Sequence, residues 1–143
     1  ARSAVEAFTR RSLLPTGWLY KLDVFPSEIR LPIGPVLAAA NVAITYVDTD
    51  GAVQTLAAAD YQVRLGDNGV MRPAYGKSWP SVRYEMDAVR IAFTAGYAAV
   101  GDIPAALIVA MERILKALYD CRGAYGPDMD SVSGLLWPHV RFT

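Results

Sequence analysis

The chain has 143 residues, which is enough for one domain with a hydrophobic core and too few to argue for two. Hydrophobic residues make up 53% of it and charged residues 20%, a composition typical of a globular and rather apolar protein. Because 14 basic residues balance 14 acidic ones, the total charge gives no reason to expect a nucleic acid or an anionic membrane as a partner. No stretch approaches the roughly 18 apolar residues of a membrane span, and no secretory signal is visible. A neutral, apolar chain of this kind favours contacts with other protein subunits.

The first forty residues predict one helix and two short strands. Residues 1–12 favour a helix, which Pro15 ends, and we expect further residues upstream because the sequence starts inside this pattern without a Met. The alternating side chains of Trp18–Phe25 then predict a strand, and Glu28–Leu31 predicts a second, shorter one. Residues 34–41 are compatible with a helical turn or with a buried strand.

Two hairpins come next, each with a turn rich in Asp and Gly. Asp50-Gly51 supplies the positive φ angles that a tight hairpin turn needs, and Gly66–Gly69 has a similar composition. A short helical turn is expected at 57–60, between the hairpins. The predicted hairpin strands are Ala43–Asp48, Ala52–Leu56, Tyr61–Leu65 and Val70–Arg72.

The following segment predicts a strand, a tight turn and a long helix. Val89–Thr94 alternates with a period of two, and Gly96 then breaks the strand. Asp102 and Pro104 mark the start of an amphipathic helix that extends to Arg122. The order of helix, about seven short strands and helix predicts an α+β fold, in which a small antiparallel β region is inserted between helices.

The last 21 residues differ in character from the rest. Residues 123–131 are rich in Gly, Asp and Ser, and an apolar run follows them. We therefore predict a domain over residues 1–122 and an extended C-terminal arm over residues 123–143. Fully burying one large apolar side chain is worth about 1.5–3 kcal/mol, so the arm must either fold back onto its own domain or bind another protein. The sequence leaves both options open.

Motifs for nucleotide or calcium binding are incomplete. Gly76–Ser78 resembles the end of a phosphate-binding loop, but Met71 stands where that motif has its first Gly. Asp48–Gly51 resembles the start of a calcium loop, but Ala59 stands at the twelfth position, where the loop needs a Glu. A surface loop and a hairpin turn explain these residues, so we predict no metal and no cofactor.

No catalytic group is predicted either. His139 is the only histidine and lies close to the C-terminus, and no Gly-x-Ser-x-Gly elbow precedes it. Cys121, the only cysteine, excludes an internal disulfide and a cysteine-based metal cluster, and we expect a packed or half-exposed thiol there. Glu85 and Asp87 lie on opposite faces of an extended segment, so they do not form a glycosidase-type pair.

Three segments are similar to one known protein family. They are Pro73–Pro80, with Tyr75, Gly76, Trp79 and Pro80; Ala88–Tyr97, with Phe93, Gly96 and Tyr97; and Ile103-Pro104, which opens the apolar helix. Together they resemble the head–tail connector (adaptor, head-completion) proteins of long-tailed bacteriophages and gene transfer agents. Residues 1–18 resemble the second helix of that family and the strand entry after it, whereas family members usually begin with an additional helical segment. The closing run Leu135–Arg141 is also similar, although His139 and Val140 depart from the family pattern.

The resemblance implies structural work in a virion and no catalysis or obligatory cofactor. Such proteins form a homo-oligomeric ring, usually dodecameric, in the neck beneath the portal protein, after assembly in the host bacterial cytoplasm. The ring extends the channel through which genomic DNA passes without sequence-specific binding, it has no membrane partner, and it gives a tail terminator or stopper protein a docking surface. The resemblance assigns portal contact to the C-terminal arm, here Leu135, Leu136, Trp137, Pro138, Val140, Arg141 and Phe142.

One alternative belongs to a different functional class. The chain could be a small ligand-binding or enzymatic α+β domain in which the Tyr75–Pro80 loop forms one wall of a pocket. A ring or a complex with a portal protein favours the connector hypothesis, whereas a monomer that ignores the portal contradicts it.

Overall fold

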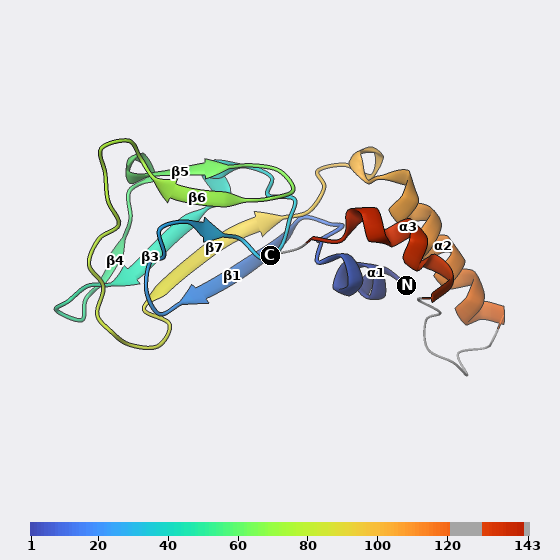
Figure 1. The fold of residues 1–143 in the computed structure, drawn as a ribbon, viewed down its shortest axis with the longest axis horizontal. Helices are drawn as coiled ribbons and strands as arrows, with labels where there is room; N and C mark the ends of the chain where they lie inside the picture. Colours follow the sequence, from blue (N-terminus) through green and yellow to red (C-terminus); the bar gives the residue numbers. More distant parts are fainter. Residues whose placement is uncertain (121–129, 142–143) are drawn as a thin grey trace.

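The computed structural model describes residues 1–120 and 130–141, which form a sandwich of two β-sheets beside a cluster of helices (Figure 1). Within these residues the α-helices are α1 (Arg2–Thr9), α2 (Ala105–Asp120) and α3 (Asp130–Leu136). The strands are β1 (Thr16–Leu22), β2 (Ile29–Arg30), β3 (Ala43–Val47), β4 (Val53–Thr55), β5 (Tyr61–Arg64), β6 (Val70–Pro73) and β7 (Val89–Ala95). Short 3₁₀ turns are η1 (Ala39–Asn41), η2 (Ala58–Asp60), η3 (Val100–Asp102) and η4 (Trp137–His139).

Both sheets are antiparallel, and β7 lies inside the larger one. The four-stranded sheet has the order β1-β7-β3-β4, and the three-stranded sheet has the order β2-β6-β5. The pairing of β1 with β7 runs from Thr16 opposite Ala95 to Leu22 opposite Val89. The alternating residues of β7 that face the other sheet are buried, as the period of two requires.

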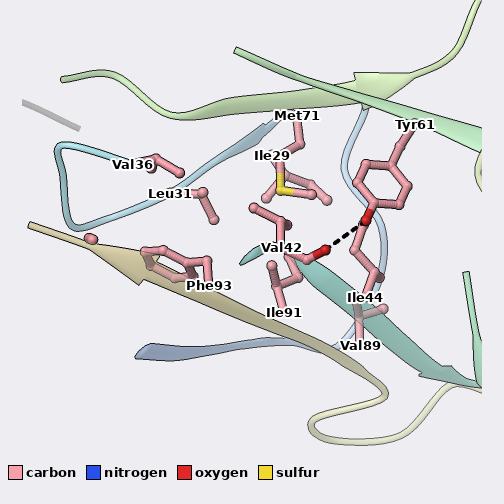
Figure 2. Packing of buried hydrophobic residues seen from close by; sticks show 11 residues of the cluster. Ile29, Leu31, Val36, Val42, Ile44, Tyr61, Met71, Val89, Ile91 and Phe93 are labelled. Carbon is pink, nitrogen blue, oxygen red and sulfur yellow. Dashed lines mark hydrogen bonds between the residues drawn. The ribbon is translucent and has the colours of Figure 1, made fainter. Parts of the chain in front are cut away.

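The main core lies between the two sheets (Figure 2). Its buried members come from both sheets and from the segment between β2 and β3, and they are Ile29, Leu31, Val36, Val42, Ile44, Tyr61, Met71, Val89, Ile91, Phe93 and Ala95. The hydroxyl of Tyr61 donates a hydrogen bond of 2.9 Å to the carbonyl oxygen of Val42, which satisfies the one polar group on this ring (Figure 2).

A second core holds the helices together. It consists of Val5, Leu13, Ile103, Leu107, Ala110, Ile114, Val132 and Leu136. The three buried residues of α2, Leu107, Ala110 and Ile114, follow the three-and-four spacing of one helical face. This face packs against α1 and α3, so the helical unit is closed by the two ends of the chain.

The α+β prediction is confirmed, with seven strands and the two Asp- and Gly-containing hairpin turns. The ambiguous residues 34–41 combine both options: Val36 forms isolated bridges with Gly66 and Ala95, and η1 follows. The first helix is shorter than expected, since Arg10 takes a left-handed conformation with φ of 53°. Cys121, the predicted helix end at Arg122 and the loop at 123–129 lie outside the described residues.

The prediction of an extended C-terminal arm is wrong for residues 130–136. They form helix α3, in which Val132 and Leu136 are fully buried in the second core. These two residues are four positions apart and therefore lie on one face, which packs against α1 and α2. Of the two options that the sequence left open, burial against the chain's own helices is the one observed for α3.

Candidate functional site

The two units meet at Arg11, whose guanidinium lies at the centre of a polar cluster. Arg11 directly follows the left-handed residue that ends α1, and a bridge with Gly34 fixes its backbone. Its side chain is 8% exposed and reaches three segments that are distant in sequence. Nε donates to the carbonyl oxygen of His139 at 2.8 Å, and Nη1 donates to the hydroxyl oxygen of Tyr97 at 3.0 Å.

Asp67 provides the negative charge that Arg11 needs. Nη1 and Nη2 of Arg11 donate to Oδ1 and Oδ2 of Asp67 at 2.5 Å and 3.1 Å, a bidentate arrangement. The hydrogen bond from Arg11 lowers the pKa of the Asp67 carboxyl, and burial opposes this effect without cancelling it. Asp67 therefore stays ionised over a wide pH range and ties the turn between β5 and β6 to the start of the chain.

The last described residue adds a second buried arginine to this junction. The backbone N–H of Arg141 donates to the carbonyl oxygen of Thr9 at 3.2 Å, and its Nη2 donates to the carbonyl oxygen of Leu31 at 3.1 Å. Burial lowers the pKa of Arg141, the nearby positive charge of Arg11 lowers it further, and Asp67 acts in the opposite direction. The C-terminal segment is thus fixed both to the helical unit and to the sandwich.

The structure divides the residues predicted to contact a portal into an inward and an outward set. Leu136 and Arg141 are buried inside the chain, whereas Trp137 is 63% exposed and Pro138 is also exposed. Trp137 and Pro138, together with Ser133 and Gly134, line a shallow apolar hollow of about 270 Å³. Leu135 and Val140 are partly buried, and Phe142 lies outside the described residues. The exposed face of the C-terminal segment is therefore centred on Trp137.

Three residues of the sequence resemblance lie in the core of the sandwich, at its edge or next to the helices. Trp79 stacks on Phe25 with a centroid distance of 4.9 Å and an interplanar angle of 6°, and Phe93 is a core residue. Gly96 has φ of 139°, and a Cβ on it would lie 2.6 Å from the backbone nitrogen of Pro15. Only glycine fits this close approach.

The other residues of the resemblance are spread over the surface and the junction. Tyr75 is fully exposed, Gly76 has a positive φ of 74°, and Pro80 is partly buried. Tyr97 accepts the hydrogen bond from Arg11 described above, and Pro104 comes directly before α2.

Among the other exposed large apolar side chains, two groups lie far apart in the fold. Tyr75, Tyr84 and Met86 lie on the long loop between β6 and β7, and they are 101%, 94% and 87% exposed. Leu115 and Tyr119 lie on the outer side of α2 and are 61% and 83% exposed. The loop and α2 are at opposite ends of the elongated molecule (Figure 1). Exposed apolar groups of this size are typical of surfaces that contact other proteins.

The described residues contain no group of three or more His, Cys, Asp or Glu side chains that could hold a metal ion. Within the same residues, no helix is both long enough and apolar enough to cross a membrane. The features that do stand out are the polar junction around Arg11 and the exposed apolar surfaces. The sequence does not single out Arg11 or Asp67, because no local pattern distinguishes a charged residue in a buried ion pair from one in solvent.

Solved structures of gene transfer agent particles contain chains with this fold. A chain in the virion of a native gene transfer agent (GTA) particle has a TM-score of 0.76 and 24% identity over 99% of this chain and 73% of its own length. A chain in the neck of the native GTA particle, computed with C12 symmetry, has a TM-score of 0.76 and 24% identity over 99% of this chain and 78% of that one. The neck of the empty particle, computed with C6 symmetry, contains a chain with a TM-score of 0.75 and 26% identity over 99% and 73%.

The chain has the fold of a GTA neck chain. This likeness covers both the sandwich and the helical cluster, because 99% of the chain takes part in it. No protein-family model and no curated protein sequence matches the chain. These neighbours come from gene transfer agent particles, one of the particle types that the sequence resemblance names.

Proposed function

We propose that this protein is a structural adaptor subunit that forms a ring in the neck of a phage-like particle, between the portal and the tail. The observation that carries the proposal is the likeness over 99% of the chain to chains in GTA neck structures computed with C12 and C6 symmetry. A dodecamer fits both symmetries. In this role the protein is not an enzyme, needs no cofactor, and forms part of the channel through which DNA passes without sequence-specific contacts.

The exposed apolar surfaces support ring formation. A closed ring of identical subunits uses heterologous contacts, which need two different complementary patches on each subunit. The β6–β7 loop with Tyr84 and Met86 offers one patch, and the outer side of α2 with Leu115 and Tyr119 offers another. We propose that neighbouring subunits bury these two patches.

We propose that the face around Trp137 contacts the portal protein, and that a tail terminator or stopper protein docks on the opposite side of the ring. Trp137 is large and exposed, which suits an aromatic anchor in an interface. Deleting the C-terminal residues is a poor test, because it also removes Leu136 from the helical core and Arg141 from the junction. Trp137→Ala leaves both of these in place.

The test is to mix the purified chain with its cognate portal and to examine the mixture by negative-stain imaging and mass photometry. We expect rings, or portal particles that carry the adaptor, and we expect Trp137→Ala to weaken the portal complex by at least about tenfold. Val53→Ala is the matched control, since Val53 is also a large exposed apolar residue but lies on β4. A chain that stays monomeric and ignores the portal would refute the proposal.

The ligand-binding alternative has weaker support. Trp79 of the Tyr75–Pro80 loop stacks against Phe25 at the edge of the core, and Tyr75 is fully exposed. The hollow around Trp137 is lined by residues of the C-terminal segment and not by this loop.

A further inference from the structure

A cavity of about 260 Å³ lies against the outer face of the three-stranded sheet, and arginines dominate its wall. Arg30 on β2, Arg64 on β5 and Arg72 on β6 line it, and Arg141 joins them from the C-terminal segment. On each strand the neighbouring residue points the other way, into the core, so the arginines project outward. Glu28 is the one acidic residue in this wall, which leaves the cavity strongly positive.

Arg141 is held in this wall with donors that have no acceptor. The residue is only 6% exposed, and Nη2 uses the carbonyl oxygen of Leu31. Nε and Nη1 are buried and donate to no acceptor among residues 1–120 and 130–141. Gly34 makes room for this placement, because a Cβ there would lie 2.8 Å from Nη1. A buried guanidinium with unused donors is costly, so an acceptor placed beside Arg141 would reduce this cost.

The other arginines show which ligand the cavity suits. Arg30 Nε donates to Oε1 of Glu28 at 3.0 Å and Arg72 Nε donates to Oε2 at 2.6 Å, so this wall already binds one carboxylate. These bonds from Arg72 and Arg30 lower the pKa of Glu28, which keeps it ionised. Arg64 is exposed and pairs with no acidic group in the described part of the chain, so its charge is available.

We propose that the cavity walled by Arg64 and Arg141 receives the carboxylate of an Asp or Glu side chain from a neighbouring protein chain. A space of this volume fits one carboxylate side chain and is small for a nucleotide. The zero net charge of the chain gives no wider basic track for the phosphate backbone of DNA. Arginine is suited to this task because its planar fork binds a carboxylate with two parallel hydrogen bonds.

In the proposed neck role, this site would bind an acidic side chain of a neighbouring chain. It can nevertheless be tested on the isolated chain, without any ring. The probe is the peptide acetyl-Gly-Glu-Glu-Glu-Gly-amide, titrated at low salt into the ¹⁵N-labelled protein while NMR follows the backbone amides of Asn68 and Gly69 and the Nε–H of Arg141. We expect these signals to shift together, and we expect the same peptide with Gln in place of Glu to leave them unchanged.

Arg64→Gln removes an exposed charge without touching the core, and it should weaken peptide binding by about tenfold. Arg90→Gln is the matched control, because Arg90 is an exposed arginine on β7 in the other sheet. It should leave the affinity unchanged. The inference is overturned if the Glu peptide shifts none of these signals, if both variants bind equally well, or if a 12-base-pair DNA shifts the signals where the peptide does not. Failure of the site leaves the ring assay above unaffected, so the two proposals can be told apart.

Discussion

The Arg11–Asp67 pair allows a quantitative test of how the two units are held together. In Asp67→Asn, the guanidinium of Arg11 remains buried, with 8% of its side chain exposed, but loses its carboxylate partner. Removing one partner of a fully buried pair costs about 3–5 kcal/mol of unfolding free energy. Asp67 itself is 56% exposed, so solvent screens part of the interaction. We therefore expect a loss of about 2 kcal/mol.

Urea denaturation followed by circular dichroism measures this loss. With a denaturant slope of about 2 kcal/mol per M, the midpoint should fall by about 1 M. Asp87→Asn is the matched control, because it breaks an ion pair of 2.6 Å with Lys21 in which the side chains of Lys21 and Asp87 are 46% and 43% exposed. An exposed pair of this kind contributes less than about 1 kcal/mol. Equal midpoints for the two variants would refute the argument that burial of Arg11 sets the cost.

The same pair predicts the sign of a pH dependence. The hydrogen bond from Arg11 lowers the pKa of Asp67 below its ordinary value of 3.8 in the folded state. A carboxyl whose folded pKa is lowered contributes stability that is complete above its unfolded pKa and is lost as the pH falls through the folded pKa. The difference in stability between the wild type and Asp67→Asn should therefore shrink as the pH is lowered below 3.8. A difference that stays constant down to about pH 2 would show that the effect is not electrostatic.

Three further substitutions test packing by denaturant midpoints. Gly96→Ala should lower the free energy of unfolding by more than about 2 kcal/mol, because φ is 139° and the new Cβ would clash with the backbone of Leu14 and Pro15. Gly17→Ala is the control: its new Cβ meets nothing within 4 Å, so it should change stability by less than about 1 kcal/mol. Leu136→Ala should cost about 2–5 kcal/mol if α3 belongs to the folded helical core, and a neutral result would mean that this helix is detached. Trp79→Phe should lower the free energy of unfolding by less than about 1.5 kcal/mol, since an aromatic ring still stacks on Phe25. The substitution also removes the buried Nε1–H, which has no acceptor among the described residues. A loss above about 3 kcal/mol would show that the indole N–H has a partner.

Patterns over short distances predicted most of the fold. The alternation along β7 and the turn residues Asp50-Gly51 are local signals, and the strands they predict are present. The C-terminal helix was missed because the Gly- and Ser-containing sequence around it suggested a loop, while its two buried residues, Val132 and Leu136, needed a partner surface on α1 and α2 to become a helix face. A helix of seven residues has little stability alone, so its formation depends on this tertiary contact.

The candidate sites were harder to predict than the fold, for a physical reason. Arg11, Asp67 and Arg141 are separated by 56 or more residues in sequence, and each lies in a segment whose local chemistry is ordinary. Their importance comes from burial at the contact of two units, which no local pattern reports. Exposed apolar surfaces could be expected in general, since the rather apolar and neutral sequence already favoured contacts with other subunits. Only the structure shows that the β6–β7 loop and α2, which carry such residues, lie at opposite ends of the molecule (Figure 1).

The side chain of Arg11 also links two segments that are distant in sequence. One guanidinium bonds to the carbonyl oxygen of His139 in the C-terminal segment and to the carboxylate of Asp67 in a hairpin turn of the sandwich. Because one side chain bonds to both segments, moving either of them changes the geometry of the hydrogen bonds that Arg11 makes to the other. If binding at the C-terminal segment is coupled in this way to binding at the β5–β6 turn, each affects the affinity of the other by the same factor.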